Sequence, residues 1–212
     1  MSASSGMTRD HWWWRPGWHE GRSFYTWHII FPSSDPMRQI TSSYAPVIKQ
    51  IETLDPVGID GIHMTLQGIG FTDEVSAADI RKIAASASSR CAQLEPIRVR
   101  IDEPRIDEEA LHMNLHPVER LAQVKQELRN GIGDVWGYEN IPESMDGFRP
   151  HISLAYSNGI APMERIDVTI KQQRLPVTDV LVSSVSLLDL NRDHGRYEWT
   201  EIATVTLGPN RH

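Results

Sequence analysis

The segment GIHMTLQGIG, residues 61–70, places a histidine two positions before a threonine in an apolar run bounded by glycines. Successive side chains of a β-strand point to opposite faces, so His63 and Thr65 share one face while aliphatic residues occupy the other. Such a strand can bury its aliphatic face in a core and present an imidazole and a hydroxyl together on the opposite face. A single copy does not distinguish a reactive site from an ordinary strand that carries a surface histidine.

A second copy of the pattern lies in RPHISLAYSNG, residues 149–159, where His151 and Ser153 share one strand face. The tripeptide H-x-[ST] alone is weak evidence, but the added requirements of aliphatic neighbours and a strand context leave only these two copies. We expect both motifs on central strands, facing one groove. His112 is a near miss, because Asn114 replaces the hydroxyl; we expect an exposed or groove-lining strand residue without catalytic function.

The composition is that of an ordinary globular protein of one domain or two closely packed lobes, with 212 residues, 40% hydrophobic and 23% charged. A net charge of −7 argues against binding to long nucleic-acid duplexes, which requires an extended basic surface, but it leaves room for a pocket that holds one or two phosphates. The single cysteine, Cys91, excludes an internal disulfide and a cysteine-based zinc site. Without a long apolar run, we expect a cytoplasmic monomer with no signal peptide and no membrane span.

Hydrophobic periodicity predicts an α+β fold built mainly from antiparallel sheets. Strands are expected where apolar and polar residues alternate, and helices where capping residues or proline open an apolar stripe. The predicted strands span residues 23–31, 62–66, 97–102, 111–115, 180–190 and 197–207, with a further strand beginning at His151. The predicted helices span residues 35–54, kinked or restarted at Pro46, then 77–91 and 117–130, and residues 131–149 are predicted to be a loop.

Residues 1–22 form an N-terminal arm that is polar at first and then carries four of the seven tryptophans. Tryptophan usually requires burial, so we expect the arm to pack on the body of the protein, a single two-lobed domain over residues 23–208.

The paired motifs resemble those of the 2H phosphoesterase superfamily, which contains bacterial 2′-5′ RNA ligases and cyclic nucleotide phosphodiesterases. The resemblance covers about residues 11–208, and the segments HWWWRPGW, FYTWHIIF and RPHISLAYSN are similar to an actinobacterial-type branch. It implies two pseudo-symmetric lobes, each an antiparallel sheet backed by helices, with one motif per lobe facing a central groove. The chain departs from some members at Gly68 and Tyr156, where an aromatic residue and an arginine occur, so substrate details do not carry over.

The chemistry of phosphodiester opening explains why the residue types come in pairs. Imidazole titrates near neutrality, so His63 and His151 can divide the roles of general base and general acid, and the sequence does not say which takes which. Hydroxyl donors at Thr65 and Ser153 would bind the charged transition state without a metal. Arg149 is a candidate for added phosphate binding, with a solvent-facing loop arginine as the alternative.

Other polar residues carry weaker signals. His28 and Tyr156 are candidates for lining the groove, although a packed strand histidine is the favoured interpretation of His28. The sequence predicts no role for the histidines in expected loops, caps or termini, which are His11, His19, His116, His194 and His212.

The sequence therefore predicts a phosphoesterase without cofactor or metal that opens 2′,3′-cyclic phosphates or 2′-5′ bonds of nucleotides or RNA ends, with reverse ligation open. One alternative is a non-catalytic RNA- or nucleotide-binding module whose aromatic side chains stack bases. The residues available for stacking are Trp12, Trp13, Trp14, Trp18, Tyr25 and Trp27. A metal-dependent phosphoesterase is disfavoured, because no H-x-x-x-H, H-x-H or aspartate cluster accompanies either motif.

Overall fold

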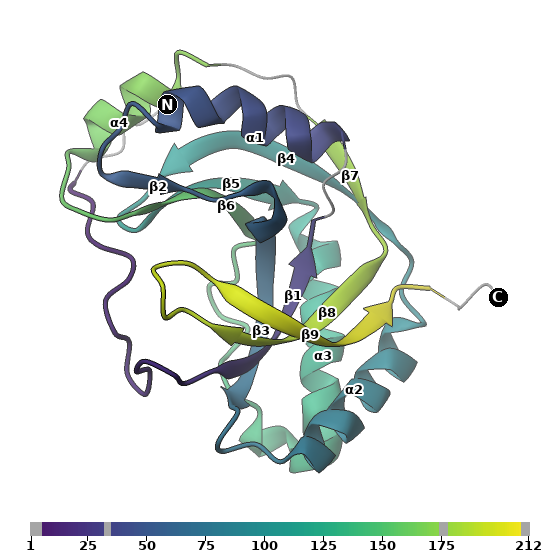
Figure 1. The fold of residues 1–212 in the computed structure, drawn as a ribbon. Helices are drawn as coiled ribbons and strands as arrows, with labels where there is room; N and C mark the ends of the chain where they lie inside the picture. Colours follow the sequence, from purple (N-terminus) through teal and green to yellow (C-terminus); the bar gives the residue numbers. More distant parts are fainter. Residues whose placement is uncertain (1–5, 32–34, 174–177, 209–212) are drawn as a thin grey trace.

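The computed structural model describes residues 6–31, 35–173 and 178–208 of the 212-residue chain and contains two antiparallel sheets (Figure 1). The first sheet has the order β3 (His63–Phe71), β1 (Phe24–Ile30), β8 (Ser184–Asn191), β9 (Glu198–Thr206). The second has the order β2 (Leu54–Pro56), β6 (His151–Ser157), β5 (Ala110–His116), β4 (Ile97–Ile106), β7 (Thr178–Val182). Each sheet takes strands from distant parts of the chain, so neither lobe is a contiguous stretch of sequence.

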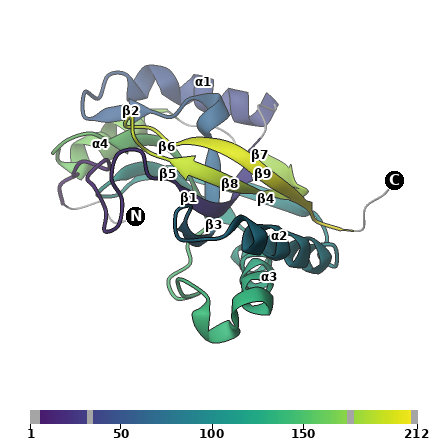
Figure 2. The same cartoon turned by 60° about the horizontal axis from the view of Figure 1, so that its bottom comes forward.

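Each sheet is covered by its own pair of helices, as Figures 1 and 2 show from two sides. The helices α1 (Asp35–Ile48) and α4 (Met163–Ile170) pack on strands of the second sheet. The helices α2 (Ala77–Cys91) and α3 (Val118–Trp136) pack on each other and on the first sheet, and α3 also touches β5. Short 3-10 turns occupy Ile59–Gly61 and Tyr138–Asn140. This arrangement confirms the predicted α+β architecture of two sheet-and-helix lobes.

The core follows from the alternation of side chains along the strands. Ile62, Met64 and Leu66 each expose at most 1% of their surface, as does Ile152 on the strand of the second motif. The strand β4 alternates buried and solvent-facing positions along most of its length. Burial of the aliphatic face leaves the opposite face of each motif strand for polar side chains.

The strand β3 is an edge strand, so the prediction of central strands is correct for β6 but wrong for β3. An edge strand leaves unpaired backbone groups that need other partners. The buried ammonium of Lys125 on α3 donates to the carbonyl of Leu66 at 2.6 Å, and the backbone N–H of Gly68 donates to Glu143 at 3.4 Å. The free edge is thus covered by a helix and the loop that follows it.

Two predicted helix boundaries are wrong, and the predicted strand over residues 180–190 is two strands, β7 in the second sheet and β8 in the first. The helix α1 ends at Ile48 instead of continuing to Leu54, and Pro46 lies inside its last turn without restarting it. Proline has no N–H for the helical hydrogen bond, so it sits where the helix is about to end. The helix α3 continues through Gly131 to Trp136, into the predicted loop. A Cβ at Gly131 would lie 3.0 Å from the backbone nitrogen of Ala87, so the glycine allows close packing of α3 on α2.

The first described part of the N-terminal arm lies along the second lobe. The backbone N–H groups of Thr8, Arg9 and His11 donate to the carbonyls of Ala161, Glu108 and Ser157 at 2.7–2.8 Å. Farther along, Arg22 bonds to Asp73 and Glu74, which follow β3 in the first lobe. The arm therefore bridges the two lobes, as its purple trace in Figure 1 shows. None of the helices in the described ranges has both the length and the apolar character that crossing a bilayer requires.

The alternation along β6 leads to a stability prediction for two isoleucines that are close in sequence. Ile152 is fully buried and Ile160 is 73% exposed. We expect Ile152→Ala to lower the free energy of unfolding by about 2–5 kcal/mol, because it removes buried methyl groups and leaves a cavity. We expect Ile160→Ala, the matched control, to change it by less than about 0.5 kcal/mol. Chemical denaturation measures both, and equal losses would contradict the described register.

Candidate active site

The two motifs meet at one cavity of about 440 Å³. His63 and Thr65 enter it from β3, and His151 and Ser153 enter it from β6. His63 and Ser153 are each 8% exposed, while His151 is the more open of the two motif histidines. The shared strand parity therefore brings two imidazoles and two hydroxyls from different lobes to one enclosed space.

Both motif histidines are oriented by the same backbone contact. The Nδ1 atom of His63 lies 2.7 Å from the carbonyl oxygen of Gly61, and the Nδ1 atom of His151 lies 2.8 Å from that of Arg149. Because a carbonyl oxygen can only accept, each Nδ1 carries a proton and donates it. In the neutral ring the other nitrogen, Nε2, then holds the lone pair that can take up a proton.

A further histidine flanks each motif from the neighbouring strand. In β1 the residue opposite Thr65 is His28, and in β5 the residue opposite Ser153 is His112. A register irregularity precedes each of these flanking histidines, and such bulges re-aim side chains beside active sites. The pseudo-symmetry of the lobes thus extends to a second pair of histidines, which the sequence motif alone does not contain.

His63 and its neighbour His28 are buried from solvent. Its ring stacks on that of His28 with centroids 4.7 Å apart, and His28 Nε2 lies 3.2 Å from the Thr65 hydroxyl. Burial lowers the pKa of His63 to about 4, with His151 adding to the effect and the Gly61 carbonyl opposing it. Burial also lowers the pKa of His28 well below its ordinary value. Both rings are therefore neutral at neutral pH.

The environment of His151 is wetter and more charged. The ring of His112 lies edge-on to it at 5.4 Å, and His112 Nδ1 is 3.3 Å from Asp107 Oδ2. Burial lowers the pKa of His151, and the nearby His112 lowers it further. The Arg149 carbonyl and the Asp107 carboxylate oppose this shift. The two motif histidines are equivalent in sequence but not in surroundings.

The N-terminal arm contributes a third cluster, of which the sequence predicted only Tyr156 as a candidate. His11 is 6% exposed, stacks on Tyr156 with centroids 4.2 Å apart, and lies 2.9 Å from the hydroxyl of Tyr197. Burial, with Arg15 next in effect, lowers the pKa of His11 to about 4. His11, Tyr156 and Tyr197 all line the cavity. The one signal for the position of His11 in the sequence is the tryptophan-rich arm, whose packing on the second lobe brings His11 inward.

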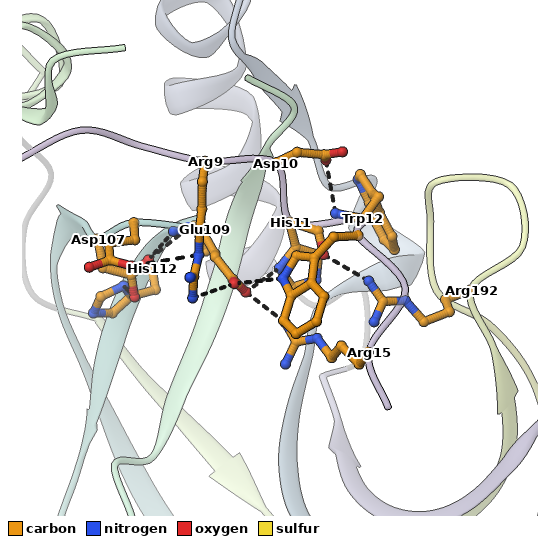
Figure 3. Close-up of polar contacts among 12 residues, drawn as sticks. Arg9, Asp10, His11, Trp12, Arg15, Asp107, Glu109, His112 and Arg192 are labelled. Atoms are coloured by element: carbon orange, nitrogen blue, oxygen red, sulfur yellow. Dashed lines mark hydrogen bonds and ion pairs between the residues drawn. The ribbon is translucent and has the colours of Figure 1, made fainter. Parts of the chain in front are cut away.

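Positive charge reaches the cavity from Arg15 and Arg192, which both line it. Arg149, the arginine predicted for this purpose, is exposed, and its side chain is not among the residues described as lining the cavity. Its carbonyl orients His151, and a phosphate contact by its guanidinium stays a prediction. Figure 3 shows Arg9, His11 and Arg15 converging on Glu109, with Arg192 approaching His11 from the turn after β8.

The tryptophans divide into separate groups. Trp27 is fully buried in the core and cannot stack on a base, contrary to the expectation that its ring is available for stacking. Trp13 and Trp14 are 43% and 48% exposed, whereas Trp18 lines the cavity and Trp12 lines a neighbouring one.

Within the described part of the chain, His, Cys, Asp and Glu side chains form no group of three or more that could hold a metal ion.

A family model described as the 2′-5′ RNA ligase superfamily matches residues 38–194. The chain belongs to this superfamily. The match includes both motifs and excludes the N-terminal arm. No curated protein sequence gives a significant match to the chain.

Solved structures show the same fold at low sequence identity. The protein TT0787 of Thermus thermophilus aligns with a TM-score of 0.67 and 19% identity, covering 90% of this chain and 100% of that one. E. coli LigT, in a complex with 3′-AMP, aligns with a TM-score of 0.65 and 19% identity, covering 88% and 98%. ATU0111 of Agrobacterium tumefaciens aligns with a TM-score of 0.56 and 16% identity, covering 85% of each chain. These proteins and this chain thus share one fold at sequence identities below 20%.

The buried neutral histidines predict that mild acid destabilises the protein. The folded-state pKa of His11 and of His63 is about 4, below the unfolded value near 6.5, so the unfolded chain binds more protons between these values. Stability is therefore present above pH 6.5 and is lost as the pH falls. From pH 7.5 to 5.0 we expect a loss of up to about 2 kcal/mol for each of these imidazoles.

The measurement is the melting temperature across this pH range in buffers without phosphate, since phosphate could bind the cavity. We expect the melting temperature to fall by at least about 4 °C at pH 5.0. A melting temperature that stays constant between pH 7.5 and 5.0 would show that these imidazoles are not buried in the neutral form.

Proposed function

We propose that the protein is a metal-independent phosphoesterase that opens 2′,3′-cyclic phosphates or 2′-5′ phosphodiester bonds of nucleotides or RNA ends, with His63 and His151 as an acid–base pair. Membership of the superfamily supports phosphoesterase-type activity. The observation that carries the proposal is the duplicated unit: an imidazole fixed through Nδ1 to the carbonyl two residues earlier, and a hydroxyl two residues later, lining one cavity from each lobe.

Hydrolysis of a cyclic phosphate requires two proton transfers. As the oxygen of water bonds to phosphorus, Nε2 of one neutral imidazole removes a proton from the water. As the bond between phosphorus and one ribose oxygen breaks, the other histidine, as the imidazolium that carries a proton on both nitrogens, donates its Nε2 proton to that oxygen, leaving a monoester beside a free hydroxyl. A sugar hydroxyl in place of water gives a phosphodiester, so the same site can catalyse ligation.

The hydroxyls are suited to hold the phosphate oxygens as charge builds up in the transition state. Thr65 can donate to phosphate only if its contact with His28 leaves its proton free. This requires the tautomer of His28 that carries its proton on Nε2 and donates to the Thr65 oxygen at 3.2 Å. We propose this positioning role for the neutral His28, while Ser153 supplies the equivalent donor from the other lobe.

The acid–base pair predicts non-additive mutant kinetics. The assay is a panel of 2′,3′-cyclic nucleotides, RNA with a cyclic phosphate end and 2′-5′ dinucleotides, with the product isomer identified by phosphorus NMR. We expect His63→Ala or His151→Ala to lower kcat at least about 10²-fold, and the double variant to cost little more, because the two groups act as a unit. Thr65→Val and Ser153→Ala should each cost roughly 10- to 10³-fold.

The matched control is His194→Ala, because His194 is exposed and pairs with Glu198 outside the cavity. His112 is unsuitable as a control, since its ring contacts His151. The proposal fails if no substrate of the panel is opened, or if a folded His63→Ala or His151→Ala variant keeps wild-type turnover. In that case a non-catalytic nucleotide-binding module explains the site better.

Metal independence is a separate prediction, because the His, Cys, Asp and Glu side chains of the described ranges form no group of three or more that could hold a metal ion, and hydroxyls are poor zinc ligands. We expect turnover of the cyclic substrate to survive dialysis against EDTA unchanged. Loss of turnover that added zinc or manganese restores would favour the metal-dependent alternative instead.

A further inference from the structure

The wall of the cavity formed by the arm and by the turn between β8 and β9 carries two guanidinium groups, those of Arg15 and Arg192. Glu109 receives Arg15 at 2.6 Å and Arg9 at 2.9 Å, so one carboxylate faces two guanidinium groups. His11 lies 3.3 Å from the same carboxylate, and Trp13 donates to it at 3.1 Å. Glu109 therefore forms ion pairs with two guanidinium groups and none with Arg192.

Arg192 is a buried cation without an ion-pair partner among the described residues. It is 3% exposed, and no carboxylate oxygen in the described part of the chain lies within 4 Å of its guanidinium. It donates to the carbonyl of His11 at 2.7 Å, and the rings of Trp12 and Trp18 lie 5.5 and 5.9 Å from it. A buried charge is costly unless it is paired, and the carboxylates of Glu109 and Asp10 act on this guanidinium only from beyond ion-pair distance.

Two hydrogen-bond donors at this wall are also unused. The Nε atoms of Arg15 and Arg192 are both buried and have no hydrogen-bond partner among the described atoms. Both side chains line the same cavity as the two motifs. Each arginine also lowers the pKa of His11, by an amount smaller than burial does, so the two positive charges act on one small region. Guanidinium groups arranged in this way suit a phosphate, whose oxygens accept several hydrogen bonds at once.

We infer that Arg15 and Arg192 form a binding site for a second phosphate of the substrate, distinct from the phosphate that reacts between His63 and His151. The inference rests on the proposed function and specifies its substrate class: nucleotides that carry a phosphate in addition to the cyclic or 2′-5′ phosphodiester group. Arg15 lies outside the region matched by the superfamily model, and Arg192 lies inside it.

The position of the site fits such a substrate. The ring of Tyr197 lies between the two regions, 5.5 Å from the ring of His63 and 6.0 Å from the guanidinium of Arg192. One side chain thus separates the second site from the reacting site, as one ribose separates the 5′-phosphate of a nucleotide from its 2′,3′-cyclic phosphate. The 5′-phosphate is therefore the group that we assign to Arg192.

The kinetic test compares adenosine 2′,3′-cyclic phosphate with and without a 5′-phosphate. We expect the wild-type protein to favour the 5′-phosphorylated substrate in kcat/KM by about 10- to 100-fold, as charge-assisted hydrogen bonds allow. Arg192→Gln should reduce this ratio towards one, Arg192→Lys should keep part of it, and Arg15→Gln should reduce it as well. Arg196→Gln is the matched control from the same turn, since Arg196 is exposed and pairs with Glu198, and it should leave the ratio unchanged.

A purely structural role for Arg192, as a clip that holds the arm through the His11 carbonyl, would lower kcat/KM for both substrates equally, and this outcome overturns the inference. Equal kcat/KM for the two substrates in the wild-type protein also overturns it. If Arg192→Gln does not fold, Arg15→Gln decides by the same ratio.

A binding measurement separates this inference from the proposed function. Calorimetry compares adenosine 2′,5′-bisphosphate with adenosine 2′-monophosphate. Tighter binding of the bisphosphate, abolished by Arg192→Gln, supports the second site even if no cyclic substrate is turned over. Equal binding of the two nucleotides contradicts the second site even if turnover is present.

Discussion

The alternation of side chains along two β-strands is the constraint on which the site depends. Each of the strands β3 and β6 buries its aliphatic residues in the core of one lobe, and this burial fixes which way the intervening residues point. A shift of either strand by one residue would move its histidine into the core and its aliphatic residues into the cavity. The same hydrophobic burial that stabilises the two lobes therefore places His63 and His151 at one cavity.

Burial and neighbouring charges then distinguish His63 from His151, which the strand pattern makes equivalent. His63 is enclosed beside the neutral His28, and burial lowers its pKa to about 4, whereas His151 opens to the cavity near His112 and Asp107. Arg15 of the arm and the buried Arg192 of the turn after β8 add guanidinium groups to the cavity, and no described carboxylate forms an ion pair with Arg192. The cavity thus combines neutral imidazoles, which can exchange protons, with fixed positive charge, which can hold an anion.

The sequence predicts those parts of the fold and site that depend on local periodicity. The two motifs and the α+β class can be recognised from residue spacing alone, and the helix predicted over residues 77–91 is found with the same bounds as α2. The flanking role of His112 could not be predicted, because it depends on the register between β5 and β6. The burial of His11 depends on where the arm lies on the second lobe. Likewise, Gly131 is read as a loop residue unless its contact with Ala87 is known.

The central claim, that imidazoles from the two lobes act on one phosphate, is tested most directly by nitrogen NMR of the histidine side chains during titration with adenosine 2′-monophosphate. A phosphate held between the two rings must contact both Nε2 atoms. The account predicts that the Nε2 resonances of His63 and His151 shift together, with one binding constant, and that the pKa of each rises on binding because the anion favours the protonated imidazole. Movement of one resonance alone, or of neither while the nucleotide binds, would contradict it.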